Sequence, residues 1–156
     1  KGTQGHLLVV AGSAGKTGAA ALCANAAMRC GTGLVTMGIG KTINQQVEPL
    51  VIEPMTVPLP CGPDGSLSID SLPPLITLAA ERQALALGPG LGTAAQTREV
   101  VAGLIQSIDV PMVIDADGLN CLAGDPSILK KTGTPVILTP HPGEMARLAG
   151  LSTKDI

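Results

Sequence analysis

Residues 111–120 read PMVIDADGLN, and we base the predicted fold on the order of residue types within them. The apolar run 111–114 is typical of a parallel strand that is buried on both faces. Two carboxylates and an amide follow it, in Asp115, Asp117 and Asn120. In open α/β sheets ligands bind outside the carboxyl ends of the strands, so these side chains are candidate site groups. The alternative is that Asp117 or Asn120 merely caps the next helix.

The alternation of an apolar run with a polar loop recurs along the chain. Further strands are predicted at residues 7–10, 33–37, 84–87 and 135–138. These runs are short and continuous, which is typical of strands covered on both faces in a parallel sheet. They lead into loops that contain Gly, Asp, His or Glu, so we expect the polar groups to meet at one edge of the sheet.

Helices are expected between the strands. They are predicted at residues 19–30, 69–80, 93–107, 119–131 and 145–149, with a short helix at 41–46. Prolines are expected to interrupt the second near residues 73–74, and the fourth should break at 124–126. Five prolines between residues 49 and 63 indicate an extended excursion at an edge or an oligomer contact. The predicted fold class is α/β, a three-layer sandwich around a mostly parallel central sheet.

Composition limits the classes of function. The 156 residues fit one domain, and a net charge of -2 provides no basic surface for nucleic acid or for an anionic membrane. The chain is 45% hydrophobic but contains no Phe, Tyr or Trp, so bases cannot stack on its side chains. Since 14% of the residues are charged, much of the surface must be small or apolar. We therefore expect a homo-oligomer.

The four cysteines form no metal-binding or redox pattern. No C-x-x-C pair occurs among Cys23, Cys30, Cys61 and Cys121, so we expect reduced thiols in a cytoplasmic protein. No segment approaches the roughly 18 consecutive apolar residues of a membrane span. The chain opens without a signal-peptide pattern and stops where a new helix starts, so we expect it to be a piece of a longer protein.

The loop after the first predicted strand matches part of a phosphate-binding loop. Residues 15–17, GKT, fit the end of the P-loop pattern, but Val10 stands where the first glycine of that pattern belongs. Gly12, Ser13 and Gly18 can still present backbone N–H groups to a phosphate at the start of a helix. The alternative is a plain tight turn.

Three other local patterns carry less information. Residues 88–92, GPGLG, let the backbone come close to a ligand, because glycine accepts positive φ and has no side chain. His141 and Glu144 have H-x-x-E spacing, but Met145 occupies the place of the second histidine of a zinc hydrolase. Ser13 lacks the G-x-S-x-G context of a serine nucleophile. We therefore expect neither a metal bound by His141 and Glu144 nor a serine hydrolase.

Taken in order, the motifs resemble one family. They are the early glycines Gly2 and Gly5, VVAGS at residues 9–13 leading to Gly18 and Ala19, GTGLV at 31–35, GPGLG at 88–92, DADGLN at 115–120 and TPHPGEM at 139–145. The series resembles the ADP- or ATP-dependent NAD(P)H-hydrate dehydratases, the carbohydrate-kinase-like domain of the YjeF type. The resemblance covers nearly the whole chain, and the ordered series is far more specific than any one motif.

The resemblance implies a ribokinase-like fold and a repair reaction on nicotinamide cofactors. Hydrated NADH or NADPH would be dehydrated to the normal cofactor at the expense of ATP or ADP, with Mg²⁺ neutralising the nucleotide phosphates. A phosphoryl group placed on the ring hydroxyl would make it a good leaving group. Its elimination would restore the nicotinamide double bond.

The resemblance also assigns roles to residues that follow predicted strands. Ala19, Gly90 and His141 match the family's contacts to the hydrated cofactor, and Asp117, Asn120 and Glu144 match positions that face the same cleft. Asp117 and Asn120 would contact the cofactor or metal-bound water. Glu144 would orient the site or its magnesium waters.

The family's last elements would come after Ile156. They are a Lys-Gly segment that contacts the nucleotide and a Gly-Thr-Gly-Asp motif that supplies the anion hole and the catalytic base. We therefore expect the catalytic residues beyond Ile156, an inactive isolated piece, and an epimerase as a fused domain or a partner. The sequence leaves open a sugar or vitamin kinase of the same fold, and a non-catalytic nucleotide-binding fragment.

Overall fold

The computed structural model describes residues 2–156, which form one sheet of six strands. The strands are β1 (His6–Val10), β2 (Leu34–Gly40), β3 (Met55–Leu59), β4 (Ala84–Leu87), β5 (Met112–Ile114) and β6 (Val136–Leu138). Their order is β3-β2-β1-β4-β5-β6, and neighbouring strands run parallel. The predicted α/β class and parallel sheet are confirmed.

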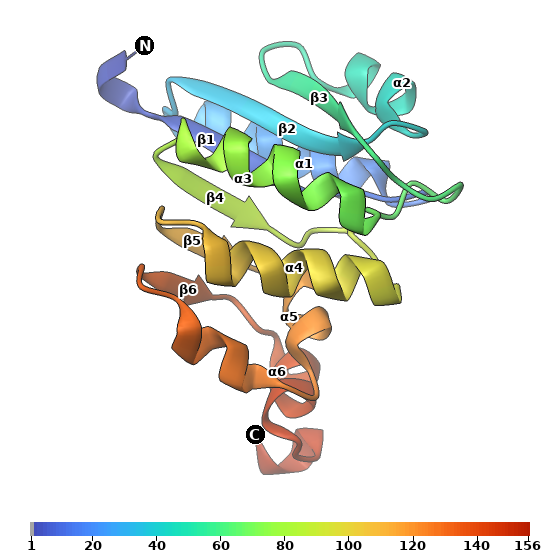
Figure 1. Ribbon diagram of the computed structural model, residues 1–156, viewed down its shortest axis with the longest axis vertical. Coiled ribbons are helices and arrows are strands. Elements are labelled where there is room, and N and C mark those ends of the chain that lie inside the picture. Colours follow the sequence, from blue (N-terminus) through green and yellow to red (C-terminus); the bar gives the residue numbers. More distant parts are fainter. Residues whose placement is uncertain (1) are drawn as a thin grey trace.

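Helices cover both faces of the sheet. They are α1 (Thr17–Arg29), α2 (Asn44–Val47), α3 (Leu72–Ala80), α4 (Ala95–Ser107), α5 (Asp117–Leu122) and α6 (Pro142–Ala149). Figure 1 shows α3 and α4 in front of the sheet and α1 behind it, which gives the three layers. No helix within residues 2–156 is both long and apolar enough to cross a membrane.

The core consists of two clusters, one on each face of the sheet. Successive residues of a strand point to opposite faces. Leu8 and Val10 accordingly lie in the cluster that contains α3 and α4, whereas Val9 packs with α1. The residues that α1 buries are alanines, among them Ala20 and Ala24, and their small side chains let the helix lie close to the sheet.

One part of the sheet remains exposed on the α1 side. Met112 and Ile114 of β5 are buried under α4, but Val113 between them is 37% exposed on the opposite face. Ile137 of β6 is 61% exposed for the same reason. The strands β5 and β6 are thus covered on one face, while their sequence pattern is that of strands buried on both.

Two expectations about prolines need correction or refinement. Pro73 and Pro74 do not interrupt a helix, because they lie in the first turn of α3, where a backbone N–H has no intrahelical acceptor. A short 3₁₀ turn, Ile69–Ser71, precedes them. The proline-rich excursion forms β3, which contains Pro58 and occupies the edge position that the prolines predicted.

Besides α3, three helical segments differ from the prediction by three residues or more at one end. The helix α2 begins at Asn44 rather than at residue 41. The predicted helix 119–131 is replaced by α5, which stops at Leu122, and by a 3₁₀ helix, Pro126–Lys131, because Gly124 between them has a positive φ of 105°. The helix α6 begins at Pro142 rather than at residue 145, since the His141 side chain caps it there.

Candidate functional site

The loops of the candidate site meet where the strand order changes direction. Along the chain β1 is followed by β2 on one side, whereas β4 lies on its other side. Ligands of parallel α/β sheets bind at such a switch point, outside the carboxyl ends of the strands. Two hydrogen bonds join the loops after β1 and β4 there. The Gly12 N–H donates to the Pro89 carbonyl at 2.9 Å, and Ser13 Oγ donates to the Gly90 carbonyl at 2.7 Å.

Lys16 and Asp117 form an ion pair that connects the ends of three neighbouring strands. Lys16 follows β1 and donates from Nζ to Asp117 Oδ2, after β5, at 2.7 Å. The Gly92 N–H, from the loop after β4, donates to the same oxygen at 2.9 Å. Asn120 Nδ2 donates to Asp117 Oδ1 at 3.2 Å. Both oxygens of the carboxylate are therefore engaged by donors.

The pair is charged at neutral pH. Burial raises the pKa of Asp117, but the hydrogen bonds from Lys16, Gly92 and Asn120 and the positive charge of Lys16 together outweigh it, so the pKa of this carboxyl lies below its ordinary value. The Asp117 side chain is 18% exposed and the Lys16 side chain 47%. Lys16 is therefore the member of the pair that solvent or a ligand can reach.

The polar contacts continue from Asp117 to α6. Arg147 Nε donates to Asn120 Oδ1 at 2.8 Å, and Arg98 Nη1 donates to the Asn120 carbonyl at 3.0 Å. Asn120 thus binds Asp117 through its amide nitrogen and Arg147 through its amide oxygen. A chain of contacts therefore links the first glycine loop to α6, whose N-cap residue is His141.

His141 and Glu144 form a capping box at the start of α6. His141 Nδ1 accepts from the Gly143 N–H at 3.1 Å and from the Glu144 N–H at 3.4 Å. The Glu144 carboxylate accepts from the His141 N–H at 3.0 Å, and its other oxygen lies 3.3 Å from His141 Nε2. The H-x-x-E spacing therefore has a structural use, which satisfies backbone donors that a helix start leaves free.

The two aspartates of the DADGLN motif have different partners. Asp115 Oδ1 accepts from Thr139 Oγ1 at 2.8 Å, so it binds the loop after β6. Asp117 faces Lys16 instead, because the chain turns at Ala116, which has a positive φ, and Asp117 is already the first residue of α5. Neither Asp117 nor Asn120 caps α5, because the N-cap residue is Ala116 and no side chain caps this helix. The capping alternative was therefore wrong.

Ala116 has a backbone conformation that L-residues avoid. Among residues 2–156 it is the sole non-glycine residue with positive φ, at φ 50° and ψ -119°. Such strain costs about 1–3 kcal/mol.

Replacing Ala116 with glycine should raise the free energy of unfolding by about 1 kcal/mol. Glycine adopts this conformation without strain, but it also has more conformational entropy in the unfolded chain, which offsets part of the gain. Urea denaturation measures this change, and a less stable A116G protein would contradict the strain.

The structure places the nine predicted site residues along the carboxyl edge of the sheet. They are Gly12, Ser13, Gly18 and Ala19 after β1, Gly90 after β4, Asp117 and Asn120 after β5, and His141 and Glu144 after β6. Gly90 packs against the first loop, since an added Cβ would lie 2.9 Å from Lys16 Cβ and 3.2 Å from Ala19 Cβ. His141 is linked to this group indirectly, through Arg147 and Asn120.

Lys16 and Arg147 are the site residues that sequence reasoning missed. Lys16 stood in a partial P-loop match, but its partner lies 101 residues away and nothing in the sequence pairs them. Arg147 occupies the last turn of α6, a place where a basic residue needs no partner because it complements the helix dipole.

The residues of the site do not form a set of metal ligands. Within residues 2–156 no group of three or more His, Cys, Asp or Glu side chains is gathered as a metal ion would require. Both oxygens of Asp117 already accept hydrogen bonds, and Asp115 binds Thr139. These carboxylates hold loops together, so we derive no step through a magnesium ion bound to them.

Comparison with known proteins identifies one family. The sequence model of the NAD(P)H-hydrate dehydratases matches residues 7–155. A bifunctional NAD(P)H-hydrate repair enzyme of Moorella thermoacetica is 45% identical over 156 residues, which are 100% of this chain and 29% of that protein. An ADP-dependent (S)-NAD(P)H-hydrate dehydratase of Neisseria meningitidis is 39% identical over 163 residues, covering 100% of this chain and 49% of the relative.

Solved structures agree with this result. The ADP/ATP-dependent NAD(P)H-hydrate dehydratase of Bacillus subtilis, crystallised with ATP and Mg²⁺ and soaked with CoA, is 30% identical with a TM-score of 0.71, over 99% of this chain and 52% of that one. A ribokinase-like superfamily protein of Enterococcus faecalis has a TM-score of 0.77 at 18% identity, over 98% of this chain and 51% of that one. The second likeness supports the fold alone.

Proposed function

Because this chain belongs to the NAD(P)H-hydrate dehydratase family, we propose that it binds hydrated NADH or NADPH and serves its ADP- or ATP-dependent dehydration. The chain spans 29% of the bifunctional relative from Moorella and about half of the Neisseria dehydratase and the Bacillus structure. The activity of a whole relative therefore comes to this chain as a proposal. We also propose that residues 1–156 are the N-terminal portion of the domain, and that the catalytic base lies outside them.

The observation that carries the proposal is the Lys16–Asp117 pair over two glycine loops. The loops after β1 and β4 bring backbone close together at the switch point, where few side chains obstruct a ligand. Lys16 supplies a half-exposed positive charge beside them. A dinucleotide has a pyrophosphate group. The backbone N–H groups at the start of α1 and the Lys16 ammonium are suited to bind it.

The remaining residues give the proposed site its shape. Gly90 packs closely against Ala19, since a Cβ added at Gly90 would lie 3.2 Å from Ala19 Cβ, and both residues are proposed contacts of the hydrated cofactor. Asp117 joins the ends of β4 and β5 through the Gly92 N–H, and Asn120 joins α5 to α6 through Arg147. His141 and Glu144 cap the start of α6 at the same edge. Gly12, Ser13 and Gly18 are the proposed phosphate contacts. The Gly12 N–H and the Ser13 hydroxyl are already bonded to the second glycine loop, whereas the Gly18 N–H lies in the first turn of α1, where it has no intrahelical acceptor. When bound, ADP or ATP would supply the phosphoryl group that makes the ring hydroxyl a leaving group, and Mg²⁺ would neutralise the charge of the nucleotide phosphates.

The proposal also extends to assembly. We expect a cytoplasmic homo-oligomer, a tetramer by resemblance, and the exposed Val113 and Ile137 are apolar side chains that a subunit contact can cover. Several relatives are named bifunctional, which supports an epimerase as a fused or partner enzyme. Light scattering of the purified protein tests the oligomer.

Calorimetric titration tests the function directly. The 156-residue chain is expected to bind NADPH hydrate but not ADP, and to show no turnover with hydrate, Mg²⁺ and either ADP or ATP. Binding without turnover is expected because the chain holds the proposed cofactor loops but not the proposed base. Failure to bind any hydrate would reject the proposal. A phosphorylated product that keeps its phosphate would identify a kinase of the same fold instead.

A further inference from the structure

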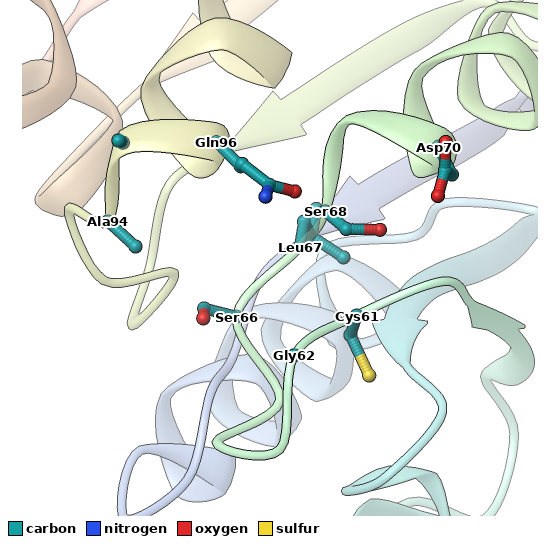
Figure 2. A pocket seen from close by; sticks show the side chains of 9 residues that line it. Cys61, Gly62, Ser66, Leu67, Ser68, Asp70, Ala94 and Gln96 are labelled. Carbon is teal, nitrogen blue, oxygen red and sulfur yellow. The ribbon is translucent and has the colours of Figure 1, made fainter.

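A cavity of about 520 Å³ lies beside the glycine loops and contains none of the residues assigned above. It is lined by Cys61, Gly62, Ser66, Leu67, Ser68, Asp70, Ala94, Ala95 and Gln96. Its walls are the segment that follows β3 and the start of α4. Figure 2 shows the Gln96 amide, the Ser68 hydroxyl and the Asp70 carboxylate in order from left to right across its upper side.

The lining suits a neutral group that carries hydroxyls. None of its nine residues is Lys, Arg or His, so the cavity offers no cation to a phosphate. None is aromatic, so a base cannot stack there on a ring. A carboxylate, two serine hydroxyls and an amide can accept from and donate to hydroxyl groups, as a ribose would require.

Gln96, Ser68 and Asp70 have free bonding capacity, whereas the Ser66 hydroxyl donates to the Asp64 carboxylate. Gln96 Oε1 accepts from the Ile69 N–H at 3.1 Å, which fixes the side chain and turns its amide nitrogen to other partners. Ser68 uses its carbonyl to accept from Ser71 Oγ, not its hydroxyl. Asp70 is exposed, so its carboxylate is accessible to solvent and to a ligand.

The cavity is attached to both glycine loops. The Ala14 N–H, in the first loop, donates at 2.8 Å to the carbonyl of Asp64, in the turn below the cavity. In the second loop Gly92 is two residues from Ala94, a lining residue, and two extended residues span at most about 7 Å. Thr97 Oγ1 donates to the Leu67 carbonyl at 3.3 Å and ties α4 to the cavity floor. One dinucleotide can therefore reach from the Lys16–Asp117 pair into the cavity.

We propose that this cavity binds the adenosine ribose of the hydrated cofactor, with the Asp70 carboxylate accepting from the ribose hydroxyls. The proposal rests on the function proposed above and adds a preference within it. An acidic residue at a dinucleotide ribose accepts from the 2′-hydroxyl of NAD-type cofactors. A 2′-phosphate adds a charge of about -1.5 to -2 at the same place and is repelled by Asp70. The site therefore selects NADH hydrate over NADPH hydrate.

The test is a pair of titrations, with NADH hydrate and with NADPH hydrate, on the wild-type protein and on Asp70→Asn. The wild type is expected to bind NADH hydrate at least about tenfold more tightly, the size of a modest charge effect at a partly exposed site. Asp70→Asn should bring the ratio of dissociation constants to within about threefold of one. Asp109→Asn is the matched control, because it removes the same charge from an exposed position outside the cavity. It should keep the wild-type ratio.

Each outcome decides between the two proposals. If both hydrates bind equally to the wild type, or if Asp70→Asn leaves the ratio unchanged, the ribose assignment is wrong while the proposed function stands. If neither hydrate binds, the proposed function fails, and AMP against adenosine 2′,5′-bisphosphate then tests the cavity alone by the same ratio. Thermal unfolding of Asp70→Asn confirms that the variant is folded, and a shift of the ratio by Asp109→Asn as large as that by Asp70→Asn would also overturn the assignment.

Discussion

Replacing Gly88 with alanine is expected to lower the free energy of unfolding by about 4 kcal/mol, from backbone strain and overpacking together. Gly88 follows β4 and has a φ of 128°, which L-residues rarely adopt. An added Cβ would lie 1.9 Å from the Asp115 carbonyl oxygen and 2.7 Å from the Gly118 nitrogen. Both are backbone atoms, so no side-chain rotation can relieve the clash. The strand ends that carry the site would have to separate.

The control for this variant is Gly133→Ala. A Cβ on Gly133 meets no atom within 4 Å, and its φ is not positive. Its free energy of unfolding should therefore stay within about 0.5 kcal/mol of the wild type, as for most surface changes. Urea denaturation of both variants gives the comparison. If Gly88→Ala proved as stable as Gly133→Ala, the close packing of the loops after β4 and β5 would be refuted.

Replacing Asp117 with asparagine is expected to cost about 2–3 kcal/mol of stability at pH 7, because hydrogen bonds to a charged group are worth about 1.5–3 kcal/mol each and this site is partly open to solvent. The variant weakens the bonds that Asp117 accepts from Lys16 and from the Gly92 N–H. Asp109→Asn, at an exposed position, should cost less than about 0.5 kcal/mol.

The same variant has a predicted dependence on pH. The folded-state pKa of Asp117 is lowered, so its contribution is present above the unfolded value of about 3.9 and is lost as the pH falls through the lower folded-state pKa. The stability difference between wild type and Asp117→Asn should therefore be constant from pH 7 to about 5 and shrink below about 4. Denaturation at a series of pH values measures it, and a difference that is unchanged at pH 2.5 would argue against the ion pair.

The sequence predicted strands better than it predicted the segments between them. The run 84–87 coincides with β4, because a short apolar run between loops leaves few other readings for a buried parallel strand. The predicted interruption of α3 at its prolines was wrong. A proline destabilises a helix in its interior but not in its first turn, and the sequence does not fix the residue at which a helix begins. The predicted helix break at Gly124 is confirmed, but the sequence did not predict that the segment after it is a 3₁₀ helix.

The sequence predicted that the candidate site lies at the carboxyl edge of the sheet, but it did not predict which side chains contact one another there. Asp117 and Gly90 could be placed because parallel strands end at the same side of a sheet. The pairing of Lys16 with Asp117 depends on β1, β4 and β5 being neighbours, which strand order decides and local pattern does not. The cavity residues 61–70 gave no motif at all, because hydroxyl and amide side chains in a loop are typical of solvent-exposed turns.

The central claim is that the glycine loops and the Lys16–Asp117 pair bind one dinucleotide at the carboxyl edge of the sheet. The most direct measurement is a titration of the ¹⁵N-labelled protein with NADPH hydrate, followed residue by residue by NMR. We expect the largest amide shifts at Gly12, Gly18, Gly90, Gly92 and Asp117. Shifts confined to the opposite edge of the sheet, or to the exposed face at Val113 and Ile137, would contradict it.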